Sequence, residues 1–152
     1  IVVGSAPGGS NDKTARTVER IIGVFPLSEQ DTIRNRFAKA FRYIASQRLI
    51  PKKESKGRCV AMEIMLNSPL ISDLIFKGEV HEIKEIMKKS RELGMQTFDQ
   101  ALFDLYEEGK ISYEDALRSA DSVNDLRLTI KLQSKEAKNR DITSGIEHLN
   151  IV

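Results

Sequence analysis

The stretch GMQTFDQALFDLYEEGKISYEDAL, residues 94–117, decides the fold class, because it holds two helices together with their start and stop signals. Gly94 is typical of a position just after a helix end, and Thr97 is placed to cap the helix that follows. Apolar residues then recur at helical spacing over 98–106, and a glycine ends that run. A capping box at 112–115 opens the next helix. Short, well-capped helices of this kind predict a small helical bundle.

Helices are also expected immediately before this stretch. Ser68 and Pro69 are typical of an N-cap and a first helical position, and they predict a short helix to about Phe76. After a break at Gly78, apolar residues at helical spacing predict another helix, which begins near Val80 and ends at the glycine that opens the quoted stretch.

Two more helices are expected in the N-terminal part. The first has an apolar face from Ala15 to Ile22 and ends near Val24, before Phe25-Pro26. A capping box at 28–31 opens a longer helix. We expect its apolar face to comprise Ile33, Phe37, Phe41, Ile44 and Ala45.

Between these helical parts the apolar pattern changes to that of a β-hairpin. Residues 49–53 and 58–66 flank a polar turn and are rich in strand formers or alternate in polarity. Cys59 is expected to be a buried structural thiol on the second strand. One face of that strand comprises Val60, Met62, Ile64 and Leu66, and the other Ala61, Glu63 and Met65.

The segment LRLTIKLQ, residues 126–133, alternates apolar and polar side chains strictly. Period two predicts a strand, and an extension of a terminal helix is the alternative. The polar residues that follow, 134–140, predict a mobile tail. The expected fold class is therefore α+β and mostly helical, with the main boundary between subdomains near Arg48.

The composition indicates a soluble globular domain, with 152 residues, 40% of them hydrophobic and 30% charged. The net charge of +2, from 24 basic and 22 acidic residues, gives no indication of a nucleic-acid or membrane partner. The single Cys59 excludes an internal disulfide bond. Because the chain begins with Ile1-Val2-Val3 and without a secretory leader, we expect it to be a piece of a larger protein.

GSAPGGSNDKT, residues 4–14, is called the glycine-rich segment below, and it is similar to a phosphate-binding loop. Gly4 and Gly9 have the spacing of G-x-x-x-x-G-K-[ST], but Ser10 stands where the lysine is required. Lys13 comes three residues late, nearly one helical turn further on. A strand-to-helix connection capped by a polar residue of the segment is the plainer interpretation.

No self-contained active site is indicated by the residues alone. His81 and Glu85 have the i, i+4 spacing of metal ligands on a helix, but further ligands are missing nearby. Cys59 has no neighbouring histidine that could activate it. We therefore predict no catalytic residue and no metal site in this chain.

The stretch 94–117 resembles the C-terminal region of type IV pilus retraction ATPases, the PilT/PilU family of secretion-type motor ATPases. Further pieces agree in order: SQRLIP at 46–51, GRCVAMEIMLNSP at 57–69 and LISDLIFKGEVHEIKEIMKKS at 70–90. Residues 125–152 resemble the PilU branch in particular. The resemblance covers about 46–152 closely, and 16–26 more loosely.

The resemblance implies a cytoplasmic, hexameric ATPase at the inner-membrane base of the pilus, which uses ATP and Mg²⁺. It implies a PilT-like ATPase and pilus platform proteins as partners, and neither nucleic acid nor membrane insertion. The phosphate loop and the acidic Mg²⁺ motifs of the family are not in this sequence. We therefore expect that this chain alone binds no nucleotide tightly and hydrolyses no ATP.

In the family a histidine box precedes the helix that begins here near Ala15. Counting along the chain puts its histidine at Pro7 or Ser10, so Pro7, Ser10 and Asn11 are expected to be nucleotide-proximal residues of a degenerate box. The resemblance also suggests contacts with a neighbouring subunit or the pilus machinery. The candidates are Arg16, Arg20, Arg58, Glu63, Leu70, Ile71, Ser72, Asp73, Leu74, Ile75, Gly94, Met95, Gln96 and Thr97.

The same resemblance divides the chain into regions. Residues 1–47 would form the C-terminal edge of a RecA-like ATPase domain, 48–67 a hairpin of the same sheet, 68–133 a helical subdomain, and 134–152 a mobile tail. Two alternatives stay open: a non-catalytic interaction module, and a fragment of a pilus-assembly or type II secretion ATPase. The latter usually carries a four-cysteine zinc insertion, which a chain with one cysteine cannot provide.

Overall fold

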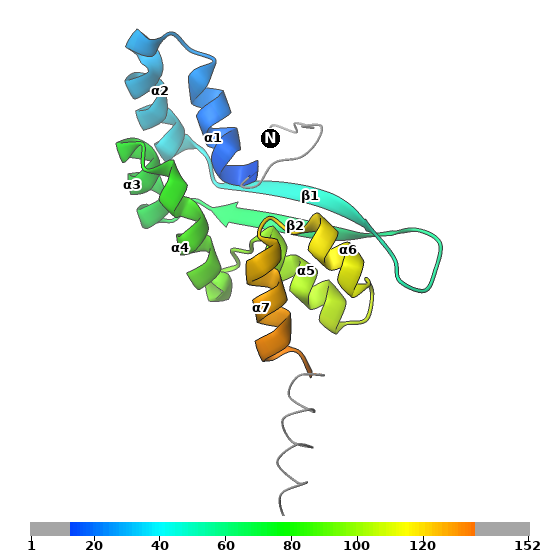
Figure 1. Cartoon of the computed structure of the whole chain (residues 1–152). Helices are drawn as coiled ribbons and strands as arrows, with labels where there is room; N and C mark the ends of the chain where they lie inside the picture. The colour runs from blue at the N-terminus through cyan, green and yellow to red at the C-terminus, as the bar shows by residue number, and fades with distance from the viewer. Residues whose placement is uncertain (1–12, 136–152) are drawn as a thin grey trace, which may run out of the picture.

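The computed structural model describes residues 13–135, and every structural statement below refers to them. An antiparallel hairpin crosses the molecule, and helices pack along it (Figure 1). In chain order the elements are α1 (Lys13–Gly23), α2 (Leu27–Ala40), β1 (Tyr43–Pro51), β2 (Arg58–Leu66), α3 (Pro69–Lys77), a 3₁₀ turn (Val80–Glu82), α4 (Ile83–Lys89), a second 3₁₀ turn (Arg91–Leu93), α5 (Phe98–Glu107), α6 (Tyr113–Ser119) and α7 (Val123–Gln133).

The hairpin pairs β1 and β2 over their whole length, from Tyr43 opposite Leu66 to Pro51 opposite Arg58. Its inner face is covered by helices, so that alternate residues of β2 are buried. These buried residues are Cys59, Ala61, Glu63 and Met65. The predicted alternation is thereby confirmed, as is the burial of Cys59, and the side that carries Glu63 is the inward one.

Two apolar cores lie along the inner face of the hairpin, and each uses residues of its strands. The first core joins α1–α4 to the Met65 end, and its buried members include Val18, Ile22, Ala38, Met65, Ile71, Ile75, Ile83, Met87 and Met95. The second core joins α5–α7 to the turn end of the hairpin, and it comprises Ile50, Cys59, Ala61, Phe98, Ala101, Leu102, Ile111, Ala116, Leu126 and Ile130.

The helix signals in the central stretch are confirmed. Thr97 and Gln100 form a reciprocal capping box at the start of α5, with the Gln100 N–H 3.3 Å from Thr97 Oγ1. The side chains of Ser68 and Ser112 cap α3 and α6. Gly94 has a φ of 94°, a left-handed conformation that favours glycine and ends the preceding turn.

The second helix is shorter than expected and is not capped by its predicted box. α2 follows Pro26, and no side chain caps its first turn. It ends at Ala40, so Ile44 and Ala45 lie in β1 rather than on the helix. The amide of Asn67 donates to the carbonyls of Ala38 and Phe41 and thereby satisfies backbone groups where the helix stops.

The strand predicted over 126–133 is wrong, and the alternative of a helix is correct. α7 places Leu126 and Ile130, four residues apart, in the second core, and leaves Leu128 and Leu132 exposed by 55% and 65%. The apolar residues with period two therefore lie on two sides of one helix. The Ser122 side chain caps this helix by accepting a hydrogen bond from the Asp125 N–H.

β1 runs without interruption through the position of the expected subdomain boundary, from Tyr43 to Pro51. In the part of the chain from 13 to 135, no helix is long and apolar enough to cross a membrane.

Candidate functional site

Five charged residues from five parts of the chain form a partly buried ionic cluster on the inner face of the hairpin, with Glu63 and Asp121 buried and the others half-buried. They are Arg48 of β1, Glu63 of β2, Lys84 of α4, Asp99 of α5, and Asp121 between α6 and α7. These residues are far apart in sequence, so only the fold brings them together. We refer to this group as the ionic cluster.

Arg48 and Asp121 form the centre of the cluster. Arg48 Nη2 lies 2.6 Å from Asp121 Oδ1, and Arg48 Nη1 donates to the carbonyl of Ser119, also at 2.6 Å. The guanidinium lies over the ring of Phe98, 4.1 Å from its centroid. The Asp121 side chain is fully buried, and its Oδ2 accepts no hydrogen bond but lies 3.7 Å from Lys84 Nζ. One arginine therefore ties β1 to the connection between α6 and α7.

Asp99 holds the same connection from the side of α5. Its carboxylate accepts hydrogen bonds from the N–H groups of Asp121 and Ser122, at 2.7 and 3.1 Å. Burial raises the pKa of Asp99, while these two N–H groups act in the opposite direction.

Glu63 is the member with the most strongly perturbed ionisation. Its side chain is 1% exposed, and its Oε2 accepts a hydrogen bond of 3.2 Å from the N–H of Thr14 in the first turn of α1. Burial raises the pKa of Glu63 to about 7, and the Asp121 carboxylate adds to the rise. The Thr14 N–H, Lys84 and Arg48 act in the opposite direction. Glu63 therefore changes its charge near neutral pH.

The ionic cluster can hold elements together, and Glu63 can take up a proton near neutral pH. Within residues 13–135, no group of three or more His, Cys, Asp or Glu side chains is arranged to hold a metal ion. The contacts within the cluster make it a candidate for positioning the elements that it joins.

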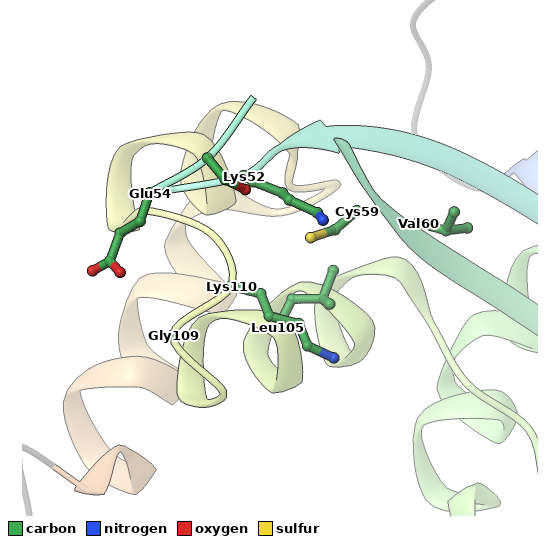
Figure 2. A pocket seen from close by; sticks show the side chains of 8 residues that line it. Lys52, Glu54, Cys59, Val60, Leu105, Gly109 and Lys110 are labelled. Carbon is green, nitrogen blue, oxygen red and sulfur yellow. The ribbon is translucent and has the colours of Figure 1, made fainter. Parts of the chain in front are cut away.

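A separate pocket of about 420 Å³ lies beside the turn of the hairpin (Figure 2). It lies between the turn and the end of α5, and Cys59 and Leu105 contribute to its wall. The lining residues, all within the described range, are Lys52, Glu54, Ser55, Cys59, Val60, Leu105, Gly109 and Lys110 and include no histidine.

The predicted interface residues of α1 and β2 divide by exposure. Arg16 and Arg20 are exposed on α1, and Arg58 is exposed at the start of β2. Glu63 is buried and belongs to the ionic cluster. Pro7, Ser10 and Asn11 lie outside the described residues, as does the expected tail from 136 onward.

The predicted interface residues of α3 also lie on two sides of that helix. Ile71, Leu74 and Ile75 are buried in the first core, whereas Leu70 is 49% exposed. Ser72 donates a hydrogen bond of 2.9 Å to the carbonyl of Ala38. The outward side therefore presents Leu70, Asp73, Phe76 and Lys77.

The connection 94–97 is held tightly within the chain. Gln96 pairs with Ile64 at the edge of β2 through backbone hydrogen bonds of 2.8 and 2.9 Å, and its side chain donates to the Met62 carbonyl. Met95 and Thr97 are buried. The connection thereby fixes α5 against the hairpin, and a role of these residues between subunits stays a prediction.

The sequence reasoning missed Arg48, Lys84, Asp99 and Asp121. Each has an ordinary pattern of surface charge along the chain, and no local signal distinguishes it.

The chain is similar to proteins of pilus motors. It is 52% identical over 133 residues to the type IV pilus ATPase PilU of Pseudomonas aeruginosa, a match that covers 86% of this chain and 35% of that protein. It is 37% identical over 106 residues to the type IV pilus retraction ATPase PilT of the same organism, covering 70% of this chain and 30% of that protein. No protein-family model matches the chain.

The fold is similar to that of a solved pilus motor. A crystal structure of the pilus retraction motor PilT with bound ADP matches with a TM-score of 0.67 and 30% identity, over 76% of this chain and 32% of that one. The chain thus spans about a third of the length of the proteins that it matches.

Proposed function

Because this chain carries the C-terminal region of a PilT/PilU-type ATPase, we propose that it is part of a hexameric motor ATPase that retracts type IV pili and so powers twitching motility. The observation that carries the proposal is the 52% identity to PilU over 133 residues. The structural similarity to PilT, with a TM-score of 0.67, supports the same assignment.

The nucleotide chemistry belongs to the parent ATPase in this proposal. The 152 residues contain no G-x-x-x-x-G-K-[ST] motif, so ATP and Mg²⁺ would be held by residues outside this sequence. Pro7, Ser10 and Asn11 would lie near the nucleotide, as a degenerate form of the histidine box. The chain by itself would bind no nucleotide tightly.

The chain would serve as the part of the motor that transmits motion. Residues 1–47 would be the edge of a RecA-like ATPase domain, 48–67 a hairpin that continues its sheet, and 68–133 a helical subdomain. The parent would act in the cytoplasm at the inner-membrane base of the pilus, with a PilT-like ATPase and platform proteins as partners.

The outward sides of α1 and α3 are the proposed contacts with neighbouring subunits or platform proteins. Leu70 and Phe76 of α3 are 49% and 56% exposed, and the ion pair of Asp73 with Lys77, at 2.7 Å, lies on the same side. Apolar side chains within a charged rim are typical of an interface. Arg16 and Arg20 of α1 supply exposed positive charge.

A chimera tests the proposed function directly. The matching region of P. aeruginosa PilU is replaced by this chain, and the chimera is produced in a strain without PilU. We expect it to restore PilU-dependent twitching, measured as the width of the twitching zone. A second chimera, with its phosphate-loop lysine changed to alanine, is the control for dependence on ATP. A chimera that is produced at the normal level and forms hexamers, yet restores nothing, would contradict the proposal.

The isolated chain gives an independent test of where the nucleotide binds. Titration with Mg-ATP, followed by calorimetry, is expected to show no saturable binding at micromolar nucleotide. Micromolar affinity would mean that the glycine-rich segment is itself a working phosphate site.

A further inference from the structure

The first turn of α1 is held in place by two other elements. The Thr14 N–H donates to Glu63 Oε2 on β2 at 3.2 Å, and Thr14 Oγ1 donates to Met87 Sδ on α4 at 3.6 Å. Thr14 and Glu63 are each 1% exposed. Thr14 is also the last residue of the glycine-rich segment, so the place where that segment joins the fold is fixed by a buried acid.

The carboxyl of Glu63 brings a hydrogen-bond acceptor to the first turn of α1. The first turn of α1 contains no acidic residue, although the N-terminal end of a helix favours negative charge. Glu63 brings an acceptor to this end from a strand that lies 49 residues further along the chain. The first turn of α1 is therefore held by a contact from a distant strand.

Glu63 is at the same time part of the ionic cluster. Its ionisation responds to Asp121, Lys84 and Arg48. With Glu63 ionised, the cluster holds three negative and two positive charges. With Glu63 neutral, it holds two of each sign. One side chain thus joins the end of the glycine-rich segment to the charges that connect β1, α4, α5 and the α6–α7 connection.

A glutamate is unusual at a buried, inward-facing position of β2 if the side chain serves only to fill the core. The neighbouring inward positions of β2 are Ala61 and Met65, and an apolar residue of similar size would be buried at lower cost. Positions that break a local rule of this kind are typically functional.

We propose that Glu63 is a positioning residue of the motor, which holds the start of α1 in register with the ionic cluster and so couples the helix that follows the predicted nucleotide-proximal residues in sequence to the helical subdomain. The nucleotide part of this inference rests on the proposed function. Glu63 would not touch ATP; it would act through Thr14.

Two substitutions separate positioning from stability. Glu63→Gln keeps an acceptor oxygen but loses the negative charge. Glu63→Met keeps a side chain of similar volume but loses both the acceptor oxygen and the charge. Because the remaining charges of the cluster balance, we expect both variants to fold with a melting temperature at least equal to that of the wild type at pH 8. Glu92→Gln, on an exposed residue, is the matched control.

The first measurement is amide hydrogen exchange on the 152-residue chain. We expect protection of the first turn of α1 to fall in the order wild type, Glu63→Gln, Glu63→Met, by about tenfold overall, while α5 keeps its protection. Unchanged protection of α1 in Glu63→Met, or an equal loss throughout the chain, would overturn the proposal.

The second measurement is ATP hydrolysis by the full-length ATPase. We expect kcat to fall in the same order, by about tenfold in Glu63→Met, with the KM for ATP within about twofold of the wild type. In the wild type and in Glu92→Gln, kcat should change with pH around pH 7. This change should be absent from both Glu63 variants. The proposal is overturned if kcat in Glu63→Met equals that of the wild type, or if it follows the melting temperature.

The two proposals fail in different ways. If the full-length wild-type protein hydrolyses no ATP, the proposed function is wrong. The role of Glu63 is then tested by hydrogen exchange alone. A loss of protection confined to the first turn of α1 would support the positioning role, and any other exchange result would contradict it.

Discussion

Arg48 and Asp121 lie 73 residues apart in sequence, yet their side chains meet at 2.6 Å and connect the hairpin to the α6–α7 connection. The Asp121 side chain is fully buried, and that of Arg48 is 16% exposed. A buried charge that loses its partner is much more costly than an exposed one, so this pair allows a clear test of the structure.

Replacing Arg48 with methionine should destabilise the chain by about 3 kcal/mol, because Asp121 is left buried with only the more distant Lys84 nearby. Urea unfolding monitored by circular dichroism measures the change. Arg127→Met, on the exposed side of α7, is the control and should alter the free energy of unfolding by less than about 0.5 kcal/mol. Equal effects of the two substitutions would contradict the burial of the pair.

Stability should fall as the pH rises from about 4.5 to about 7, because of Glu63. Its pKa is raised from 4.5 to about 7, so in this window the folded state binds a proton that the unfolded state has lost. The contribution of Glu63 is fully present below pH 4.5 and is lost by the time the pH exceeds 7. Its size is at most about 3 kcal/mol. Urea unfolding at several pH values should give a shallower dependence in Glu63→Gln, and an unchanged dependence would contradict the raised pKa.

Substitutions in α7 should distinguish a helix from a strand. Leu126→Ala and Ile130→Ala remove side chains from the second core and should each cost about 2–4 kcal/mol. Leu128→Ala and Leu132→Ala alter exposed side chains and should each cost less than about 0.5 kcal/mol. A strand would place all four residues on one face, and similar losses for all four would support it.

Neighbouring residues of α3 should separate folding from contact with partners. Ile71→Ala should lower the free energy of unfolding by about 2–5 kcal/mol, because Ile71 is fully buried in the first core. Leu70→Ala should leave stability nearly unchanged but reduce the activity of the PilU chimera in twitching. Normal twitching with Leu70→Ala and with Phe76→Ala would remove the outward side of α3 from the proposed interface.

Local signals were sufficient for most helices, because their ends are set by residues that act on their own backbone. Ser68, Thr97 and Ser112 each accept a hydrogen bond within the first turn of the helix that they begin. Such contacts span three residues and can be recognised in the sequence. The resemblance to retraction ATPases was also available from the sequence, and the identity to PilU confirms it.

The errors arose where distant contacts decide the structure. α2 stops where Asn67, far along the chain, donates to its carbonyl groups. α7 is a helix although its apolar residues alternate with polar ones in the sequence, because only two of the four, Leu126 and Ile130, pack in the second core. The ionic cluster could not be predicted as a group, because its five members come from five segments and only Glu63 is among the residues singled out from the sequence.

The hairpin is shared between the two cores, since Met65 contributes to the first and Ile50, Cys59 and Ala61 to the second. If either group of helices unfolded, one end of the hairpin would be exposed while its other end stayed packed against the remaining helices. The two halves should therefore melt together in a single cooperative transition, and a motor built with this element would pass a displacement of one half to the other rather than absorb it in a loose joint.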